Sequence, residues 1–221
     1  LIIPQVSTKY SNREANYGKI KDGIERIIAI QPGNYFVFFP SFDFLSRVHR
    51  LLQAEGFQVL AQRREMKRDE INTVLERLRA ADQPTLVLAV QGGVFAEGVD
   101  YPGEMLIGAI VVGPALPTFD FEREMLRAYY AGKHGDENSF DYAYTFPAMA
   151  KVVQSAGRVI RSHSDRGLIV LMDRRFVNSS YVKSMPADWV GDDPHAFVSQ
   201  QLTADILRFW EGRFDLVTLE D

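Results

Sequence analysis

The chain has 221 residues, 46% of them hydrophobic, which is enough to bury one domain core with room for a small appendage. Its 25 Lys and Arg residues against 29 Asp and Glu residues give a formal charge of −4. A protein that coats nucleic acid through bulk charge is basic, so any contact with nucleic acid must come from a local patch.

Cysteine is absent, which excludes disulfides and thiolate metal sites within the chain. The His residues are too scattered to favour a His-based metal site. No apolar stretch approaches the roughly 20 residues that a membrane helix needs. The chain starts at Leu1 and has no signal-peptide pattern. We therefore expect no metal site, no membrane contact and a cytoplasmic fragment of a longer protein.

The first part of the chain alternates between helical and extended patterns. Residues 1–18 are mixed and polar and predict an extended segment. Ile residues at helical spacing predict a helix over 19–30, and the aromatic run YFVFFP predicts a buried strand over 35–40. Ser41 is the expected N-cap of the next helix, which we expect to end at Gly56.

The alternation continues along the rest of the chain. Apolar runs predict strands over 57–62, 85–90, 106–113 and 167–172, and apolar periodicity predicts helices over 70–81 and 121–133. A further helix is expected from Phe146, with Thr145 as its cap and Pro147 in its first turn. Beyond Arg175 the pattern weakens to a loop over 185–194 and a closing helix over 195–212. Apolar strands alternating with helices predict an α/β fold with a parallel sheet covered on both faces.

The sequence QSAGRVIR, in the helix expected from Phe146, carries the strongest chemical signal. Gln154, Arg158 and Arg161 would lie within roughly 60° on one helix face. The apolar residues of this helix would form the adjoining side, and they are Met149, Ala150, Val153, Ala156 and Ile160. Gly157 would let a ligand or another backbone come close. Two guanidinium groups on one stripe suit a polyphosphate.

A structural interpretation of the same arginines stays open. They could instead form a surface ion-pair network with Asp165 and Asp173, because exposed arginines are common on helices.

A second candidate is the glycine-rich stretch VQGGVFAEGVDYPGE, over residues 90–104. It follows an apolar strand directly, and ligands bind at the carboxyl ends of strands in open parallel sheets. Gly98 would let the backbone approach a ligand, and Glu97 and Asp100 could contact a ribose, orient a water or pair with an Arg. An ordinary tight loop with a capping acid is the alternative.

A third candidate surrounds the first strong strand. Ser41 and Phe42 begin a helix, and a hydroxyl beside free backbone N–H groups suits a phosphate, although a plain N-cap explains Ser41 equally. The nearby run QRREMKR includes Arg63 and Arg64, which could track a nucleic-acid backbone or simply begin a solvated helix.

The sequence contains no GxxxxGK[ST] phosphate loop and no Asp-Glu pair after an apolar strand to hold Mg²⁺. Arginines suited to phosphate without a phosphate cradle indicate half of a site, whose other half must come from another domain.

The order of FFPSFDFL, GGVFAEGVDYPGE, QSAGRVIRSHSDRG and LMDRRF resembles the C-terminal motor domain of the DinG/XPD family of superfamily-two DNA helicases, over roughly residues 30–180. STKYSNREANYG and YVKSMPADW resemble its bacterial DinG-like branch. The resemblance implies a RecA-like fold of the P-loop NTPase type, with three layers, a mainly parallel central sheet and no phosphate loop of its own. It divides the chain into an extended segment (1–18), the RecA-like domain (19–185, with a helical insertion at about 118–145) and a C-terminal loop and helix (186–221).

The resemblance also implies residue roles. Arg158 and Arg161 would be arginine fingers on the γ-phosphate of ATP, with Gln154 in the same contact. Gly98 and Asp100 would lie near the nucleotide. Glu97 would couple that contact to DNA. Ser41 would contact the DNA backbone, and with it we predict Phe42 and the basic-run residues Arg63 and Arg64 as the DNA-binding set.

As a whole, the resemblance implies an ATP-dependent 5′–3′ DNA helicase in DNA repair or replication, with an isolated chain that is inactive. ATP with Mg²⁺ would be bound mainly by an absent first motor domain, and single-stranded DNA would be the other partner. A 4Fe–4S cluster, if present, would lie in the absent part. The alternative is a non-catalytic nucleic-acid or partner-binding module with a degenerate RecA fold.

Overall fold

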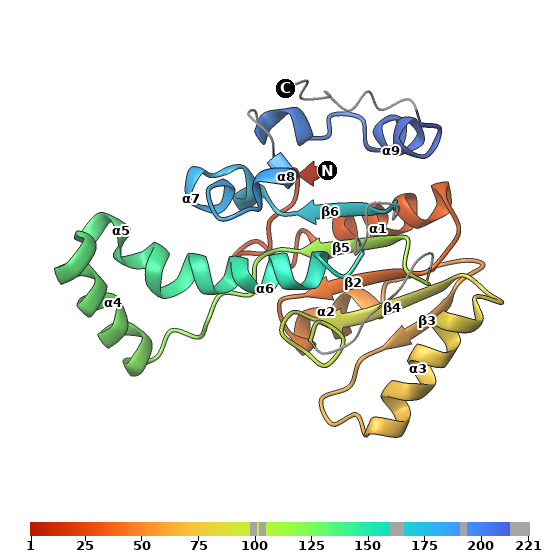
Figure 1. The fold of residues 1–221 in the computed structure, drawn as a ribbon, viewed down its shortest axis with the longest axis horizontal. Helices are drawn as coiled ribbons and strands as arrows, with labels where there is room; N and C mark the ends of the chain where they lie inside the picture. Colours follow the sequence, from red (N-terminus) through yellow and green to blue (C-terminus); the bar gives the residue numbers. More distant parts are fainter. Residues whose placement is uncertain (98–100, 102–104, 160–165, 191–193, 213–221) are drawn as a thin grey trace.

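The computed structural model describes residues 1–97, 101, 105–159, 166–190 and 194–212. In this part of the chain six strands form one sheet, in which every paired strand is parallel and the order is β1-β6-β5-β2-β4-β3 (Figure 1). The strands are β1 (Ile2–Ile3), β2 (Tyr35–Phe39), β3 (Gln58–Ala61), β4 (Thr85–Val90), β5 (Gly108–Val112) and β6 (Leu168–Met172). The predicted parallel α/β sheet is confirmed.

The three central strands consist of buried residues along their whole length. Val37 of β2 lies opposite Leu88 of β4 and Ile110 of β5. A strand buried on both faces needs apolar side chains in both directions, which explains the continuous apolar runs in the sequence.

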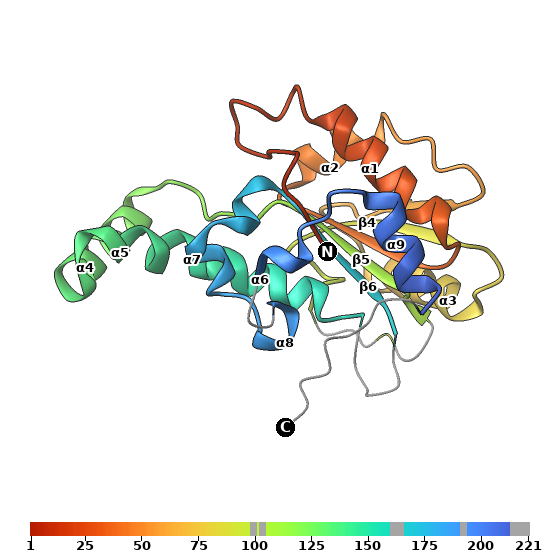
Figure 2. The ribbon, with the colours of Figure 1, turned by 90° about the horizontal axis from the view of Figure 1, so that it is seen from above.

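Helices cover both faces of the sheet (Figure 2). One apolar core joins the sheet to α1 (Tyr17–Ile30), α2 (Phe42–His49) and α9 (Leu202–Trp210). The second core, on the opposite face, contains residues of α3 (Arg68–Ala80), α6 (Phe146–Ala156) and α7 (Ser179–Val182), with α8 (Ala187–Val190) packed against it. The chain therefore has the expected three layers.

The N-terminal segment, expected only to be extended, adds a strand to the sheet. β1 pairs with β6 at the edge of the sheet, and Ile2 and Ile3 are both buried. Its outer side is covered by residues near the C-terminal helices, where the Ser199 N–H donates to the Ile2 carbonyl at 2.9 Å. A strand of two residues is too short to give an alternating pattern, so the sequence did not predict it.

α2 ends at His49, so the predicted end at Gly56 is wrong. Leu51, expected in its apolar stripe, is 46% exposed. The Gln53 N–H donates to the Glu25 carboxylate of α1 at 2.6 Å. This contact joins the chain after α2 to α1.

The start of the helix predicted from Phe146 is confirmed, because α6 begins at Phe146 and has Pro147 in its first turn. α4 (Phe121–His134) is followed by α5 (Asp136–Phe140), a π-helical turn (Asp141–Thr145) and then α6. Thr145 has helical dihedrals and no capping hydrogen bond, so the predicted cap is wrong. Pro147 has no N–H for the carbonyl four residues earlier, and the π turn accommodates it. The Arg123 guanidinium donates to that carbonyl, on Ala143, at 3.2 Å.

The C-terminal part differs from prediction in two places. α8 lies inside the stretch predicted as loop, and a 3₁₀ turn (Pro194–Phe197) precedes α9, so one continuous closing helix is absent from the described residues.

Candidate functional site

Apart from Gln154 and Arg158, the predicted site residues that the structure describes lie on segments that follow neighbouring strands. Ser41 and Phe42 follow β2, and Arg63 and Arg64 follow β3. The glycine-rich loop follows β4, which lies between those two strands. Because all three strands are parallel, their carboxyl ends meet at one edge, where open sheets bind ligands.

Ser41 and Phe42 lie at the start of α2. The Ser41 hydroxyl accepts a hydrogen bond from the Phe44 N–H at 3.2 Å, so Ser41 is an N-cap, as its alternative interpretation held. The Arg64 guanidinium lies over the Phe42 ring, 4.9 Å from its centroid. The fold thus brings together an aromatic face and a charged group that are separated by about twenty residues in sequence.

Arg63 is exposed and pairs with Glu70 of α3. The Lys67 N–H also donates to the Glu70 carboxylate, at 2.8 Å, so Glu70 stabilises the first turn of the helix. The basic run therefore precedes and enters a helix start, and it presents Arg63 and Arg64 to solvent.

Two buried aromatic side chains anchor the loop after β4 to the core. Phe95 and Tyr101 are fully buried, and the Tyr101 hydroxyl donates to the Phe95 carbonyl at 3.1 Å. Gly92 adopts φ +69°, a conformation that favours glycine. Glu97 is exposed at the end of this anchored part. Two other residues predicted for this loop, Gly98 and Asp100, lie outside the described residues.

Arg158 connects the end of α6 to that loop. Its Nε donates to the Ala96 carbonyl at 2.8 Å, although the two residues are 62 positions apart. Arg158 is half-buried, and its neighbour in the contact directly precedes Glu97. The structure therefore brings together two segments that the sequence singled out separately.

The predicted arginine stripe on one helix face is wrong in its geometry. α6 ends at Ala156 with Gly157 as its C-cap, so Arg158 lies beyond the helix. A Cβ at Gly157 would lie 3.0 Å from the Val153 carbonyl oxygen, so the glycine fits the helix end. Arg161 lies outside the described residues. The buried face also differs from prediction, because Ala150 is exposed and Val152 is buried.

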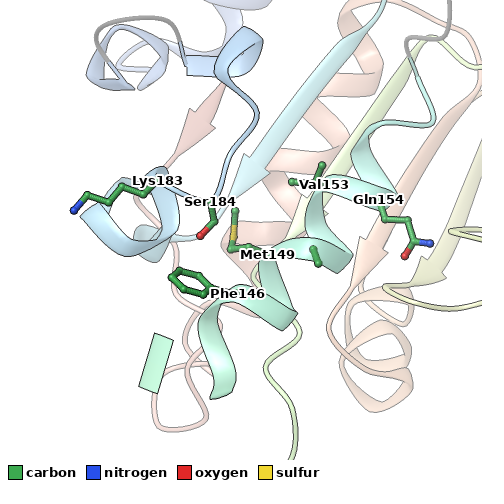
Figure 3. A pocket seen from close by; sticks show the side chains of 7 residues that line it. Phe146, Met149, Val153, Gln154, Lys183 and Ser184 are labelled. Atoms are coloured by element: carbon green, nitrogen blue, oxygen red, sulfur yellow. The ribbon is translucent and has the colours of Figure 1, made fainter. Parts of the chain in front are cut away.

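Gln154 lies on α6 and is half-exposed. It borders a shallow cavity of about 640 Å³ between α6 and the residues after α7, lined also by Phe146, Met149, Ala150, Val153, Lys183 and Ser184 (Figure 3). The Gln154 side chain points away from the Phe146 and Lys183 end of this cavity (Figure 3). Sequence reasoning did not find this hollow, because α7 and its Lys183 have no periodic signal.

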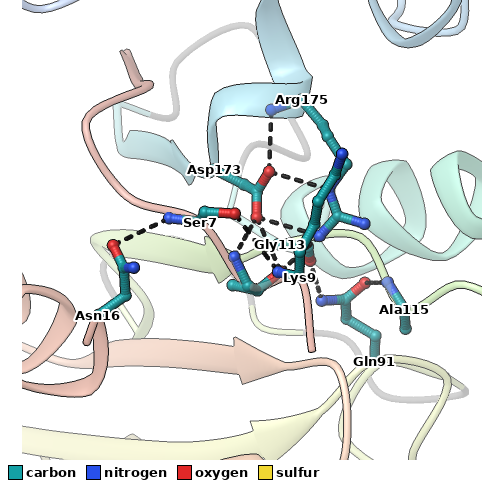
Figure 4. A network of polar contacts seen from close by, with 9 residues as sticks. Ser7, Lys9, Asn16, Gln91, Gly113, Ala115, Asp173 and Arg175 are labelled. Carbon is teal, nitrogen blue, oxygen red and sulfur yellow. Dashed lines mark hydrogen bonds and ion pairs between the residues drawn. The ribbon is translucent and has the colours of Figure 1, made fainter. Parts of the chain in front are cut away.

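A buried polar network occupies the other part of the same sheet edge, after β1, β5 and β6 (Figure 4). Asp173 is 0% exposed. Its carboxylate accepts hydrogen bonds from the Thr8 N–H and hydroxyl, each at 2.7 Å, and from Arg175 at 2.8–3.0 Å. The suggestion that Asp173 pairs with surface arginines is therefore wrong, since it is sealed against its own neighbours.

Gln91 and Gly113 extend this network to β4 and β5. The Gln91 amide donates to the Gly113 carbonyl at 2.6 Å and accepts from the Ala115 N–H at 3.1 Å. Gly113 has φ +64°, and a Cβ there would lie 2.1 Å from the Thr8 hydroxyl. The network thus needs a glycine at the position after β5, where Thr8 of the N-terminal segment packs closely. An Asp directly after a strand was its only signal in the sequence.

The charge of Asp173 is stabilised by its partners. Burial alone would raise the pKa of this carboxyl, but the hydrogen bonds and charge of Arg175, together with Thr8, hold it below its usual value. The same carboxylate raises the pKa of Arg175 against the effect of burial. The pair is thus ionised throughout the neutral range.

Over the residues that the structure covers, no three His, Asp or Glu side chains come close enough to hold a metal ion. Within the same residues, no helix is long and apolar enough to cross a membrane.

Solved structures with the same architecture include an XPD helicase, with a TM-score of 0.67 and 23% identity over 83% of this chain and 32% of that one. The S. tokodaii protein Xpd4 gives a TM-score of 0.60 at 18% identity, over 91% of this chain and 36% of its own. At these identities the likeness shows the fold, which is the RecA-like fold of a helicase domain.

Similar sequences are found among DNA helicases. "ATP-dependent DNA helicase chl1" of Aspergillus fumigatus is 26% identical over 82% of this chain and 28% of its own length. "Regulator of telomere elongation helicase 1 homolog" of Drosophila melanogaster is 25% identical over 94% of this chain and 23% of its own. The chain thus spans about a quarter of these relatives. Neither is bacterial, and the bacterial branch stays a prediction.

The family model described as "Helicase C-terminal domain" matches residues 24–191, which include β2 to β6 and both segments joined by Arg158. This is well over half of the chain. The chain therefore belongs to the helicase C-terminal domain family of the XPD/DinG type, as its motif order implies.

Proposed function

We propose that this chain is the second motor domain of an ATP-dependent DNA helicase that moves 5′ to 3′. The observation that carries the proposal is the Arg158–Ala96 hydrogen bond, because it joins the arginine segment to the glycine-rich loop in one unit. A movement of the arginine segment on ATP hydrolysis would then also move the glycine-rich loop. The family match and the helicase names of the relatives support this assignment.

The residues present fit one side of an ATP site. Arg158, Arg161 and Gln154 supply fixed positive charge and an amide, which suit a developing phosphate charge. The sequence has no phosphate loop, and Mg²⁺ and most nucleotide contacts are assigned to a first motor domain. ATP supplies the phosphoanhydride bond, and Arg158 and Arg161 stabilise charge there as arginine fingers, worth about 10³–10⁵ in rate in other nucleotide hydrolases.

The DNA side is assigned to the exposed part of the sheet edge. Phe42, with Arg64 over its ring, offers a stacking face beside positive charge, the combination used for single-stranded nucleic acid. Arg63 and Ser41 lie on the same segments and would contact the backbone. Gly98 and Asp100 are assigned to the nucleotide, and Glu97 is assigned the coupling of that contact to the DNA side.

The remaining assignments follow from the family. Single-stranded DNA and a first motor domain are the proposed partners, and the cytoplasm is the proposed location. Any 4Fe–4S cluster would need thiolates from outside this chain, which has no Cys. The isolated chain is expected to hydrolyse essentially no ATP.

The test is ATP hydrolysis by the full-length protein with single-stranded DNA, comparing wild type with Arg158→Ala and Arg158→Lys. We expect both variants to lose at least a hundredfold in turnover while ATP still binds, because a point charge does not replace a planar guanidinium. Arg77→Ala, on the exposed side of α3, is the matched control and should keep the wild-type rate. Wild-type turnover in Arg158→Ala would instead favour the non-catalytic binding module.

A further inference from the structure

The insertion between the glycine-rich loop and α6, residues 119–145, forms an arm made of α4, α5 and the π turn (Figure 1). The charged side of α4 faces inward. Arg123 donates to the Ala143 carbonyl, Arg127 Nε lies 3.4 Å from the Ser139 hydroxyl, and the Glu124 carboxylate accepts from Tyr144 at 2.5 Å. Arg123, Glu124 and Arg127 therefore make their polar contacts within the arm.

The apolar side of α4 faces outward. Phe121, Met125 and Tyr129, spaced four residues apart, are 79%, 56% and 59% exposed. No residue of α4, all of which the structure describes, is buried. A surface helix normally turns its apolar stripe toward a core. This reversed pattern, continued by exposed Ala128, indicates a surface that packs against something else.

Gly132 lies at the end of the same stripe and supports this interpretation. A Cβ there would meet no atom within 4 Å, so nothing in the described chain requires a glycine. Glycine is among the least favourable residues inside a helix. Its position beside Ala128 gives the outward face a flat, small-residue strip, which another backbone can approach closely.

Charge argues against nucleic acid as the occupant of this face. Residues 119–145 contain Asp120, Glu122, Glu124, Asp136, Glu137 and Asp141 against only Arg123, Arg127 and Lys133. Arg123 and Arg127 already contact partners within the arm. The third cation, Lys133, lies over the Tyr129 ring, and the arm as a whole carries more acidic than basic side chains, which a phosphate backbone would repel.

The size of the face argues against a freely diffusing protein. Three exposed side chains of at most about 250 Å² each fall short of the roughly 800 Å² per partner of a stable interface. A tethered partner needs less area, because a linker gives it an effective concentration near millimolar. The relatives are about four times as long as this chain, so they carry ample further polypeptide.

We propose that the outward face of α4 docks on an apolar surface elsewhere in the same polypeptide, and thereby holds the two motor domains in register. This inference rests on the proposed function, which supplies the second domain. The arm extends beyond the end of the sheet toward which the strand arrows point (Figure 1), where the other half of the ATP and DNA sites is expected. An apolar partner surface with few charges would match Phe121, Met125 and Tyr129.

The test uses thiol labelling of Ala128→Cys, a small change at the centre of the face in a chain that has no other Cys. Maleimide modification of the Ala128→Cys peptide is followed by mass spectrometry, in the 221-residue chain and in the full-length protein. We expect labelling at least tenfold slower in the full-length protein. Glu76→Cys, exposed on α3, is the control and should label equally in both.

A second variant separates docking from folding. Gly132→Leu adds a side chain into open space, so the 221-residue chain should unfold at an unchanged or higher temperature. In the full-length protein the same substitution should restore fast labelling of Ala128→Cys, because it blocks close approach.

Three outcomes would overturn the docking proposal. Equal labelling in both proteins means that nothing covers the face. Protection that appears only with added oligo(dT) assigns the face to DNA, and protection in the isolated chain that grows with concentration assigns it to a second copy. None of these readouts depends on ATP hydrolysis, so docking can fail while the Arg158 test succeeds, or the reverse.

Discussion

The two parts of the sheet's carboxyl edge carry similar residue types in opposite states. After β1, β5 and β6, Asp173, Arg175 and Thr8 are buried, and they satisfy one another's hydrogen bonds. After β2 and β3, Arg63 and Arg64 are exposed, with contacts to one carboxylate and one ring. A charge that is sealed stabilises the fold, whereas a charge left at the surface can still bind a ligand.

This difference gives a rule for interpreting arginines in this chain. Arg175 donates to the Thr8 hydroxyl and so holds the N-terminal segment against the end of β6. We therefore expect its loss to lower the free energy of unfolding. Arg158 is half-buried and donates a hydrogen bond to the Ala96 carbonyl of the glycine-rich loop, so we expect its loss to lower activity. Substitutions on the two sides of the edge should therefore separate stability from activity.

The largest effect is expected for Asp173→Ala. It leaves Arg175 buried without its carboxylate, and breaking a buried ion pair in this way costs about 3–5 kcal/mol. Urea unfolding of the 221-residue chain measures this loss. Arg63→Ala, which breaks an exposed pair, should change the unfolding free energy by less than about 1 kcal/mol. Equal losses in the two variants would contradict the comparison.

The contribution of Asp173 to stability should also depend on pH. Because the folded pKa of Asp173 is lowered, its contribution is present above the ordinary carboxyl pKa near 4 and is lost as pH falls through the lower folded value. Wild type should therefore lose stability below about pH 4 more steeply than Asp173→Asn, in which that carboxyl cannot titrate.

A smaller effect is expected for Gly113→Ala. Its Cβ would overlap the Thr8 hydroxyl at a left-handed backbone position, which predicts a loss of about 1–3 kcal/mol. Gly56→Ala is the matched control, because Gly56 has φ +78° but open space around it, so only the backbone strain remains. Thermal unfolding of both variants measures the two losses of stability. If Gly56→Ala is as unstable as Gly113→Ala, Thr8 does not pack against Gly113 as described.

The smallest effects are expected on DNA binding. Arg63→Ala and Arg64→Ala should each weaken binding of single-stranded DNA by the full-length protein several-fold and flatten its salt dependence by about 0.7 in slope. Fluorescence anisotropy of labelled oligo(dT) across a salt series measures both quantities. If affinity and slope match those of Arg77→Ala, the exposed edge is not a DNA contact.

The sequence predicted the sheet and its helices well because each central strand is a continuous apolar run. β2 and β4 could be placed within a residue, since burial on both faces leaves no ambiguity about their extent. Prediction failed where tertiary contacts decide. α2 ends at His49, and Gln53 beyond it contacts Glu25 of α1, whereas a π turn replaces the predicted Thr145 cap before α6.

The candidate site was predicted in its residues but not in its geometry. Helical spacing placed Arg158 on the face of Gln154, whereas Gly157 ends the helix between them. The contact of Arg158 with Ala96 spans 62 positions and has no local signal. The buried role of Asp173 was missed for the same reason, since its partner Thr8 lies at the other end of the chain.

We propose that Arg158 acts in ATP hydrolysis, whereas Arg175 stabilises the fold through its buried contacts with Asp173 and Thr8. The most direct measurement takes Arg158→Ala and Arg175→Ala and determines both the unfolding free energy and the DNA-stimulated ATP turnover of each. We expect Arg158→Ala to lose turnover at a nearly unchanged unfolding free energy, and Arg175→Ala to lose several kcal/mol of stability. If Arg158→Ala hydrolyses ATP at the wild-type rate, or is as unstable as Arg175→Ala, the account is contradicted.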